Sequence, residues 1–345
     1  MLISNLEYLT LFVITFVIVG FLTPVMRSIA LKNKILDLPN SKHKSHVTPI
    51  PYLGGVAIII GVITVSYLTL VFSNFSLSYF LLATSVLAPA FAMGMVGLWD
   101  DLTNLPPLPR FFAQTIAGIV VAASLVLSDN IGNPSGSTII DVSLTVLWVV
   151  GICNSINFFD NLDGGAAGTA AISAIFLTYL SIQSSQTFVA ALSIVVAGAT
   201  SGFLIWNKVP ARIYMGDAGA LFLGVLLATL TVRLKPNTET TVVSLFIPVL
   251  LLSIPILDTS VAVISRLRRR ASPFEGGRDH LSHRLIRAGL SRKITVLLLW
   301  SLSVVFGLFA IMINSVNKNS EFFFIILSLL IWAILFIGFL KTSDT

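Results

Sequence analysis

Short polar clusters interrupt a chain that is otherwise almost continuously apolar. The clusters are Lys42–His46, Asp100–Asp101, Asn154–Asp163, Asn207–Asp217 and Arg278–Arg284. Their carboxylate, amide, imidazole and guanidinium groups could bind a metal ion, hold a phosphate or transfer a proton. Because ionisable groups are costly in hydrocarbon, a largely apolar chain that keeps such clusters is expected to use them for chemistry.

The adjacent carboxylates Asp100 and Asp101 follow a long apolar run and precede Pro106, where a helix should give way to a loop. Two like charges this close resist joint ionisation unless a cation is near. Perturbed carboxylate pairs often mark functional sites, although a solvated helix end is the alternative interpretation. The pair is therefore a candidate catalytic group.

The densest signal is a polar repeat with a spacing of three residues, formed by Asn154, Asn157, Asp160 and Asp163. On a helix these positions would form one polar stripe, if the helix persists that far. The following Gly164-Gly165 would end the helix and let a ligand approach the backbone. A calcium loop of the EF-hand type is disfavoured, because the twelfth position from Asp160 is Ala171 rather than glutamate.

The segment from Asn207 to Gly219 predicts a loop that reopens into an apolar span at about Ala218. Asp217 would either cap that span or bind a metal ion. Tyr214 would either stack on a flat ligand or anchor the chain at the membrane interface.

In the longest polar loop, His280 and His283 stand three residues apart between Arg278 and Arg284. This spacing suits either one metal ion or two contacts to an anionic ligand. The zinc signature His-Glu-x-x-His is not met, because no carboxylate lies between the histidines. Phosphate is favoured over zinc, since arginine supplies paired donors and no cysteine is near.

Two further features lie close to this loop in the sequence. The basic run Arg266–Arg270 is most simply a lipid-headgroup anchor. Asp258 lies inside an apolar stretch, where an acid must face protein or water rather than acyl chains. The many oxygen donors in the clusters suit magnesium, which usually binds one or two carboxylates plus substrate phosphates. The clusters together predict metal-assisted phosphoryl transfer at a membrane surface.

The elements that must position these clusters are membrane helices. Apolar residues make up 56% of the 345 positions, and charged residues make up only 10%, against roughly 25% in soluble domains. The net charge of +6 is dispersed among apolar runs, which argues against nucleic-acid binding. Cys153 is the only cysteine, so no intrachain disulfide can form.

Eleven stretches approach the length of about 20 apolar residues that a span needs. They are Tyr8–Ala30, Leu53–Phe72, Ser78–Leu98, Phe111–Leu127, Thr138–Cys153, Ala166–Ile182, Thr187–Ile205, Ala218–Val232, Thr241–Ile264, Ile294–Ile313 and Phe322–Leu340. We expect an all-α polytopic membrane protein with ten or eleven transmembrane helices, folded as a single domain over residues 1–345. The first stretch lacks a basic leader and a clear cleavage signal, so it is expected to remain as a span.

Orientation follows from Lys and Arg on alternating loops. With the amino terminus outside, 18 of the 21 bases fall on the inner side, which the positive-inside rule favours. All five polar clusters then lie on inner loops, so the active site is expected on the cytosolic face.

In this order, the clusters resemble those of the polyprenyl-phosphate N-acetylhexosamine-1-phosphate transferases, glycosyltransferase family 4. That family includes the translocase that makes the first lipid intermediate of peptidoglycan. The resemblance is carried by His46–Gly55, Asp100–Asn104, Asn154–Gly165, Met215–Gly219 with Phe222–Gly224, and His280–Leu285.

The resemblance implies an enzyme of the bacterial cytoplasmic membrane. It would move N-acetylhexosamine 1-phosphate, most simply N-acetylglucosamine 1-phosphate, from a UDP-sugar to undecaprenyl phosphate with release of UMP. The lipid-linked product would initiate an envelope polymer such as teichoic acid or lipopolysaccharide. The resemblance also implies magnesium as cofactor, with manganese as the alternative, and leaves a homodimer open. Phosphoryl transfer suits these residues, because it depends mainly on positioning and charge neutralisation.

The resemblance also implies a role for each candidate residue. Asp217 would bind the metal with Asn157 as a second ligand, and Asp100 would orient or deprotonate the lipid phosphate with Asp101 as its partner. Lys44 and His46 would lie near that phosphate. The nucleotide would be held by Asn154, Asp160, Asp163 and Tyr214, the sugar or diphosphate by Arg278, His280, His283 and Arg284, and Asn207 is a further substrate-binding candidate.

The sequence departs from the family pattern at Ser282, where a third histidine is frequent, and at Tyr52, where arginine is frequent. The last motif resembles the N-acetylglucosamine branch more than the peptidoglycan translocase, which argues against a muramyl-pentapeptide donor. A cation-coupled secondary transporter is the alternative, motivated by Asp258, and its binding site would lie at the midplane of broken helices. A pseudoenzyme that serves as a scaffold is a third hypothesis.

Overall fold

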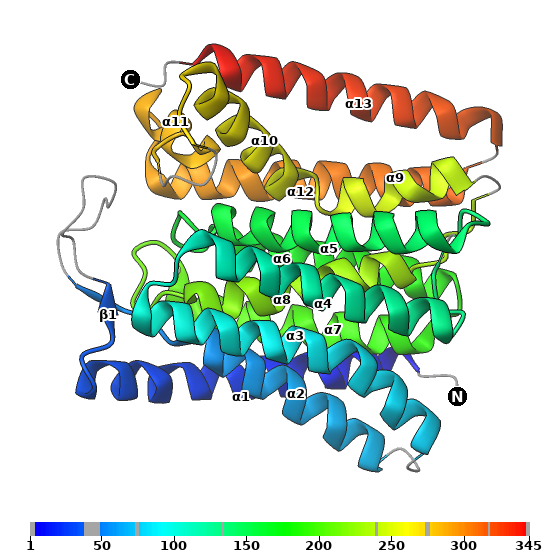
Figure 1. Cartoon of the computed structure of the whole chain (residues 1–345), viewed down its shortest axis with the longest axis horizontal. Coiled ribbons are helices and arrows are strands. Elements are labelled where there is room, and N and C mark those ends of the chain that lie inside the picture. The colour runs from blue at the N-terminus through cyan, green and yellow to red at the C-terminus, as the bar shows by residue number, and fades with distance from the viewer. Residues whose placement is uncertain are drawn as a thin grey trace.

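The computed structural model describes residues 4–37, 49–72, 76–132, 134–238, 241–272, 277–316 and 318–342. Most of these residues are helical, and the helices run lengthwise through one bundle (Figure 1). The helices are α1 (Asn5–Lys32), α2 (Gly54–Phe72), α3 (Leu77–Thr103), α4 (Pro107–Leu127), α5 (Thr138–Phe159), α6 (Gly165–Gln183), α7 (Thr187–Asn207), α8 (Gly216–Arg233), α9 (Thr241–Leu251), α10 (Ser253–Arg268), α11 (Leu281–Arg287), α12 (Arg292–Ser315) and α13 (Lys318–Lys341). Two short strands, β1 (Leu36–Asp37) and β2 (Ile50–Pro51), pair antiparallel.

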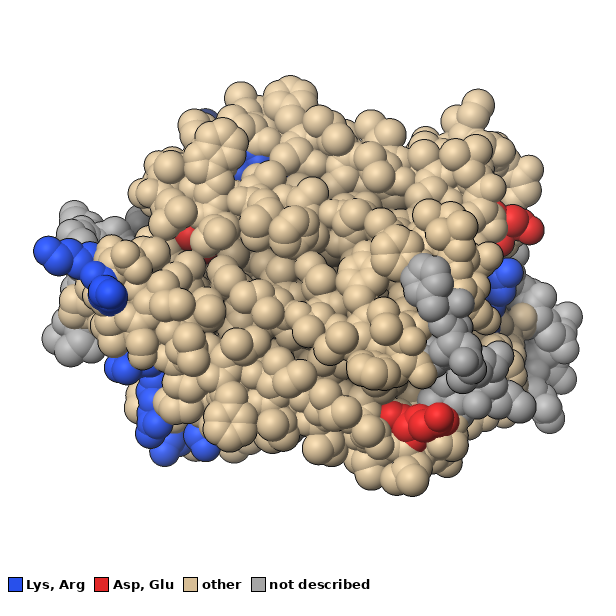
Figure 2. All heavy atoms as spheres, turned by 90° about the horizontal axis from the view of Figure 1, so that it is seen from below, with Lys and Arg blue, Asp and Glu red and all other residues tan. Residues whose placement is uncertain are grey.

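The helices confirm the predicted polytopic membrane protein. Ten of the described helices are long and apolar enough to cross a membrane, and the bent pair α9 and α10 would make an eleventh span. Figure 2 shows a broad band without charged side chains, with Lys and Arg gathered mainly at one end of that face. The start of α1 and the end of α13 lie at opposite ends of the bundle (Figure 1), which agrees with an odd number of crossings.

The ninth predicted span is not one straight helix, because α9 and α10 meet at a bend of 80°. Pro255 in the first turn of α10 has no N–H and cannot bond to the carbonyl of Leu251, four residues earlier. The hydroxyl of Ser173 on α6 donates to that carbonyl instead, at 2.6 Å. A backbone break is tolerated in a membrane where neighbouring helices satisfy the freed groups in this way.

The centre of the bundle is α8, in which nearly every residue is buried. Both α3 and α5 pack directly against it. Gly97 permits the close approach of α3, because a Cβ at this position would collide with the backbone carbonyl of Asp217. The end of α3 therefore lies against the start of α8, where two of the polar clusters meet.

Candidate active site

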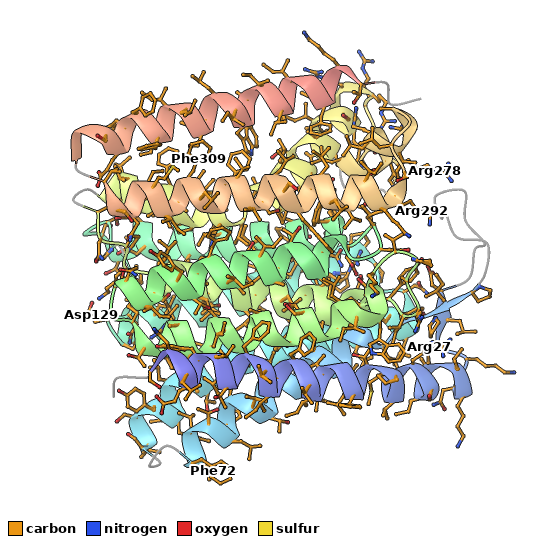
Figure 3. All side chains as sticks on the ribbon, turned by 180° about the vertical axis from the view of Figure 1, so that it is seen from behind. Arg27, Phe72, Asp129, Arg278, Arg292 and Phe309 are labelled. Carbon is orange, nitrogen blue, oxygen red and sulfur yellow. The ribbon has the colours of Figure 1, made fainter. Side chains whose placement is uncertain are left out.

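A pocket of about 610 Å³ lies at the end of the bundle where α3 and α5 finish and α8 begins. Ten of the predicted site residues line it: Asp100, Asp101, Asn157, Asp160, Asp163, Asn207, Tyr214, Asp217, His280 and His283. Arg278 and Arg292 lie at this end of the molecule, whereas Asp129 lies at the other (Figure 3). Four of the five polar clusters thus converge at helix ends, not at the middle of spans as the transporter alternative would require. The remaining cluster, with the predicted residues Lys44 and His46, lies outside the described residues.

Arg110 supplies the cation that the clustered carboxylates require. Its Nη1 donates to Asp100 Oδ2 at 2.6 Å and to Asp217 Oδ2 at 3.0 Å. The other oxygen of Asp100 accepts from the N–H of Leu105 at 2.6 Å, and the other oxygen of Asp217 accepts from Asn157 Nδ2 at 2.7 Å. In the sequence Arg110 is only one of the 18 bases on the inner side, and its place ten residues after Asp100 is the available signal.

Asp101 has a different role from its neighbour, because it caps α8 from a separate helix. Its two oxygens accept from the backbone N–H groups of Asp217 at 2.9 Å and Ala218 at 3.1 Å, which have no acceptor within their own helix. Gly216 has φ +75°, and a Cβ there would lie 2.6 Å from Asp101 Oδ2, so glycine is required. The interpretation of Asp217 as the cap of its own span is therefore wrong, and its carboxylate is left to line the pocket.

Two tyrosines brace this carboxylate region. Tyr52, which stands where the family often has arginine, donates its hydroxyl to the backbone carbonyl of Asp101 at 2.7 Å. Tyr52 also forms an isolated backbone bridge with Tyr214, which lines the pocket. Burial raises the pKa of both hydroxyls. The carboxylate of Asp163 raises the pKa of Tyr214 further, and that of Asp101 raises the pKa of Tyr52 further, so both side chains stay neutral at pH 7.

The predicted polar stripe is only partly helical. α5 ends at Phe159, so Asn157 lies on its last turn, Asp160 follows as the C-cap, and Asp163 lies in the next turn. Asn154 is directed toward α4, where its Nδ2 donates to Gln114 Oε1 at 2.6 Å, and it is absent from the described lining of the pocket. Asn154 also lies one turn, about 4.5 Å, further from the end of α5 than Asn157 does. The structure therefore places Asn154 outside the described pocket lining, and its predicted contact with a nucleotide stays a prediction.

Asn207 and Asp163 tie together the two loops that flank the pocket. The side chain of Asn207 is 2% exposed; its Oδ1 accepts from the N–H of Gly164 at 2.9 Å, and its Nδ2 donates to the carbonyl of Ile213 at 3.0 Å. Asp163 Oδ2 accepts from the N–H of Ala211 at 3.0 Å. Asn207 lines the pocket, but both ends of its amide are used to hold the loops together.

The carboxyl group of Asp160 has a strongly raised pKa. Burial raises its pKa well above the ordinary value, and the carboxylates of Asp217 and Asp101 raise it further. A cation that enters the pocket would lower this pKa and favour the ionised carboxylate.

The two histidines also line the pocket, with ring centroids 6.3 Å apart. Burial, and then the neighbouring ring of His280, lowers the pKa of His283 to about 4, so that His283 is a neutral imidazole at pH 7. Within the described ranges, no three His, Cys, Asp or Glu side chains form a ready-made metal site. The spacing of three suits either two contacts to an anionic ligand or one metal ion, as predicted. Between them, Ser282 donates its hydroxyl to Asn161 Oδ1, where the family often has a third histidine.

Two arginines of this motif are placed away from the described pocket lining, contrary to their predicted sugar or diphosphate contacts. Arg284 is 1% exposed, and its guanidinium donates to the carbonyls of Asp279 and Phe339 at 2.8 Å each. Consecutive residues on a helix are rotated by about 100°, so Arg284 faces away from the side that His283 occupies. Arg284 fastens the end of α13 to the motif, and Arg278 is exposed at the surface.

The interpretation of Arg266 as part of a lipid anchor is wrong. Arg266 is 3% exposed, its Nε donates to Asp279 Oδ2 at 2.9 Å, and it lines the pocket over the ring of Phe158. Although burial raises the pKa of Asp279, its ion pairs with Arg266 and Arg269 lower it overall. The available signal was helical spacing, because Arg266 follows Asp258 by about two turns on the same face. Asp37 and Arg292 also line the pocket and were not singled out.

The oxygen donors around Asp217 fit a magnesium ion. Asp217 and Asn157 are in contact at 2.7 Å and offer a carboxylate and an amide group, and Asp160 lines the same pocket. Magnesium usually binds one or two carboxylates and completes its coordination with substrate phosphates and water. The donor set therefore suits an ion that binds together with a phosphorylated substrate.

Known proteins resemble this chain over most of its length. Residues 83–235 match the family described as Glycosyl transferase family 4. The chain is 30% identical over 329 residues to a Bacillus subtilis (strain 168) protein named "Probable undecaprenyl-phosphate N-acetylglucosaminyl 1-phosphate transferase", covering 94% of this chain and 90% of that protein. It is 33% identical over 322 residues to the decaprenyl-phosphate N-acetylglucosaminephosphotransferase of Mycolicibacterium smegmatis, covering 84% and 79%. It is 25% identical over 327 residues to the phospho-N-acetylmuramoyl-pentapeptide-transferase of Staphylococcus carnosus, covering 88% and 97%.

Proposed function

This chain belongs to glycosyl transferase family 4, and on that premise we propose that it transfers N-acetylglucosamine 1-phosphate from UDP-N-acetylglucosamine to undecaprenyl phosphate. An oxygen of the lipid phosphate attacks the β-phosphorus of the donor. The bond between that phosphorus and the bridging oxygen breaks, UMP leaves, and a lipid-linked diphospho-sugar remains. The names of the Bacillus and Mycolicibacterium relatives support a polyprenyl-phosphate acceptor and an N-acetylglucosamine donor.

The observation that carries this proposal is the convergence of Asp100, Asn157, Asp217 and His280 around one pocket. These residues come from four separate polar clusters along the chain. Transfer of a phosphoryl group depends on holding two anionic substrates in line and offsetting their charge. A pocket that combines carboxylates for a metal with arginines and histidines for phosphate oxygens suits that requirement.

The donor would occupy the side of the pocket formed by the turn after α5. Tyr214 offers a neutral ring for the uracil, and Asp160 and Asp163 lie beside it along the pocket lining. Asp217 and Asn157 would hold magnesium, which when bound supplies positive charge to the diphosphate oxygens. Manganese has similar oxygen preferences and is the alternative ion.

The acceptor phosphate would be received beside the bonded pair of Asp100 and Arg110. The Arg110 guanidinium already bridges two carboxylates, so an incoming phosphate meets a cation that is held in place on both sides. Asp100 would orient that phosphate or accept its proton, while Asp101 keeps α8 capped. His280 and His283, with Arg266, would contact the sugar diphosphate from the opposite wall.

The same charge distribution supports a cytosolic active site in a bacterial inner membrane. The bases counted for the inner side surround the pocket end, where Arg27, Arg278 and Arg292 lie (Figure 3). A nucleotide-sugar donor is made in the cytosol, so this orientation brings donor and pocket together. The product would then initiate an envelope polymer such as teichoic acid or lipopolysaccharide.

A transfer assay tests the proposal. Purified protein with magnesium, undecaprenyl phosphate and each member of a panel of UDP-sugars should release UMP and form a lipid diphospho-sugar, fastest with UDP-N-acetylglucosamine. UMP release and the lipid product should appear in equal amounts. Turnover that prefers UDP-muramyl-pentapeptide would overturn the donor assignment, and product formation without undecaprenyl phosphate would overturn the acceptor assignment.

A further inference from the structure

Asp258 is a buried acid that the proposed function does not use. It lies on α10 shortly after the bend and is 0% exposed. Its Oδ2 lies 2.7 Å from His280 Nδ1, and its Oδ1 accepts from the N–H of Leu281 at 2.7 Å. Both oxygens of this buried acid are therefore engaged by the first residues of the histidine motif.

These contacts determine where the imidazole of His280 carries its hydrogen. A carboxylate only accepts, so Nδ1 of His280 must donate to Asp258. Nε2 of the same ring lies 3.3 Å from Arg266 Nη2, and a guanidinium only donates, so Nε2 must accept. Asp258, His280 and Arg266 form a directional chain of hydrogen bonds that ends at the pocket, since His280 and Arg266 both line it.

We propose that Asp258 is a positioning residue that holds His280 with its hydrogen on Nδ1 and its Nε2 toward Arg266 and the pocket. The effect on turnover rests on the proposed function, whereas the position of the hydrogen does not. The second oxygen of Asp258 fixes the ring relative to the backbone at Leu281, so the ring cannot tilt without breaking one of two bonds. Removal of the carboxylate would disturb both the imidazole and the guanidinium beside it.

Asp258→Asn is the informative substitution because it keeps the shape and replaces one acceptor with a donor. The N–H of Leu281 cannot give up its hydrogen, so the amide oxygen of Asn stays with it. The amide NH₂ then faces Nδ1 of His280, which must become the acceptor and move its hydrogen to Nε2. That hydrogen would point at the donor of Arg266, and the chain of hydrogen bonds would break, as when a histidine is held in the wrong tautomer.

Nitrogen-15 NMR of the histidine-labelled full chain in lipid tests the position of the hydrogen without any activity. The chain has 4 histidines, and His280→Gln identifies the signal of interest by its loss. We expect hydrogen on Nδ1 in the unmodified protein and on Nε2 in Asp258→Asn. Thr259→Val is the matched control on the same helix, because the buried Thr259 hydroxyl has no hydrogen-bond partner among the described residues. Hydrogen on Nε2 of His280 in the unmodified protein would overturn the proposal even if Asp258→Asn fails to fold.

A double-mutant cycle tests whether Asp258 acts through His280. Asp258→Asn should lower kcat/KM by about 10- to 100-fold, the loss typical for an outer partner of a functional histidine. In the His280→Gln background the same substitution should have no further effect, because the ring that it positions is gone. Independent losses that multiply in the double variant would contradict the proposal. If the unmodified protein transfers no sugar phosphate, the proposed function fails, and the NMR result alone decides the role of Asp258.

Discussion

Polar side chains are used differently at the two ends of the bundle. At the pocket end, the carboxylates of Asp100 and Asp217 converge on Arg110 beside an open cavity. At the opposite end, the amide of Gln186 donates to the backbone carbonyl of Arg233 at 2.8 Å. The first arrangement concentrates charge next to empty space, and the second uses neutral groups to tie the backbone.

The opposite end repeats this pattern in several loops. Gln186 Oε1 accepts from the N–H of Lys235 at 2.7 Å, and Asn314 Oδ1 accepts from the N–H of Asn237 at 2.8 Å. The N–H of Gly132 donates to the carbonyl of Val232 at 2.9 Å. Side-chain amides thus satisfy backbone groups of several described loop residues at this end.

The comparison indicates that polar residues needed for turnover lie at the pocket end, whereas polar residues that stabilise the fold lie at the opposite end. Clustered carboxylates repel one another and are retained for binding, so their removal should harm turnover more than folding. Amides that satisfy buried backbone groups stabilise the fold, so their removal should harm folding more than turnover.

Removal of divalent metal should have the largest effect. With EDTA, UMP release should fall to background, and added magnesium or manganese should restore it. The thermal unfolding midpoint without substrate should hardly change, since the ion is expected to bind with the diphosphate. Full turnover in EDTA would contradict the magnesium assignment, and a large drop in the midpoint would indicate a structural metal instead.

Asp217→Asn should come next, with kcat lowered by about a thousandfold, the upper range for loss of one electrostatic contact in a reaction centre. The thermal midpoint should stay the same or rise, because one of the crowded carboxylates is gone. Asp129→Asn is the matched control, since Asp129 lies at the opposite end (Figure 3). Equal turnover of both variants would remove Asp217 from the proposed metal site.

Arg110→Gln should lower kcat/KM by about 10- to 100-fold and also destabilise the protein. Without the guanidinium, Asp100 and Asp217 face each other with no shared counter-charge, and loss of one member of a paired, partly buried charge is costly. Arg27→Gln at the same end is the control, because Arg27 donates only to the carbonyl of Arg212 among its described bonds. A stable and fully active Arg110→Gln variant would break the argument that this cation holds the site together.

Gln186→Ala should have the reverse profile. Loss of its two hydrogen bonds should lower the free energy of unfolding by about 1 kcal/mol, because the part-buried carbonyl of Arg233 loses its partner, whereas the exposed N–H of Lys235 can bond to water. The kcat/KM of the folded protein should remain unchanged. Parallel transfer assays and denaturant titrations of the purified variant measure both quantities, and a selective loss of turnover would mean that the two ends are coupled.

The smallest effect concerns acid sensitivity. The pKa of His283 is about 4 in the folded protein, below the ordinary value near 6.5, so the unfolded chain binds the proton more readily between these pH values. Stability from His283 is therefore complete above about pH 6.5 and is lost as the pH falls toward 4. His283→Gln should flatten the pH dependence of the thermal midpoint in this window. An unchanged slope would show that His283 is already protonated in the folded protein or that other groups dominate.

The sequence was sufficient to predict the helical bundle and the convergence of the polar clusters. Both depend on hydropathy and charge, which act on each segment separately before the helices pack. The confirmed placement of Asp100, Asp217 and His280 in one pocket follows from their positions at the same ends of alternating spans. Topology alone brought these residues to one end of the molecule.

Details that depend on packing between helices could not be predicted. Pro255 marked a weak point in the ninth span, but the bend of 80° also required Ser173 from another helix. The direction of Asn154 depends on its partner Gln114 on the neighbouring helix α4. Arg266 resembled a surface anchor because its partner Asp279 stands 13 positions further along the chain.

The cross-helix cap of α8 has a consequence for how the protein is made. Asp101 leaves the ribosome well before Asp217 and Ala218, whose N–H groups it will accept. Until the later helix enters the bilayer, the carboxylate has no such donors, and afterwards the first turn of α8 is completed only when α3 is alongside. The packing of α8 against α3 in the membrane therefore also completes the reaction centre. A chain that ends between these two helices should insert into the membrane but have no transferase activity.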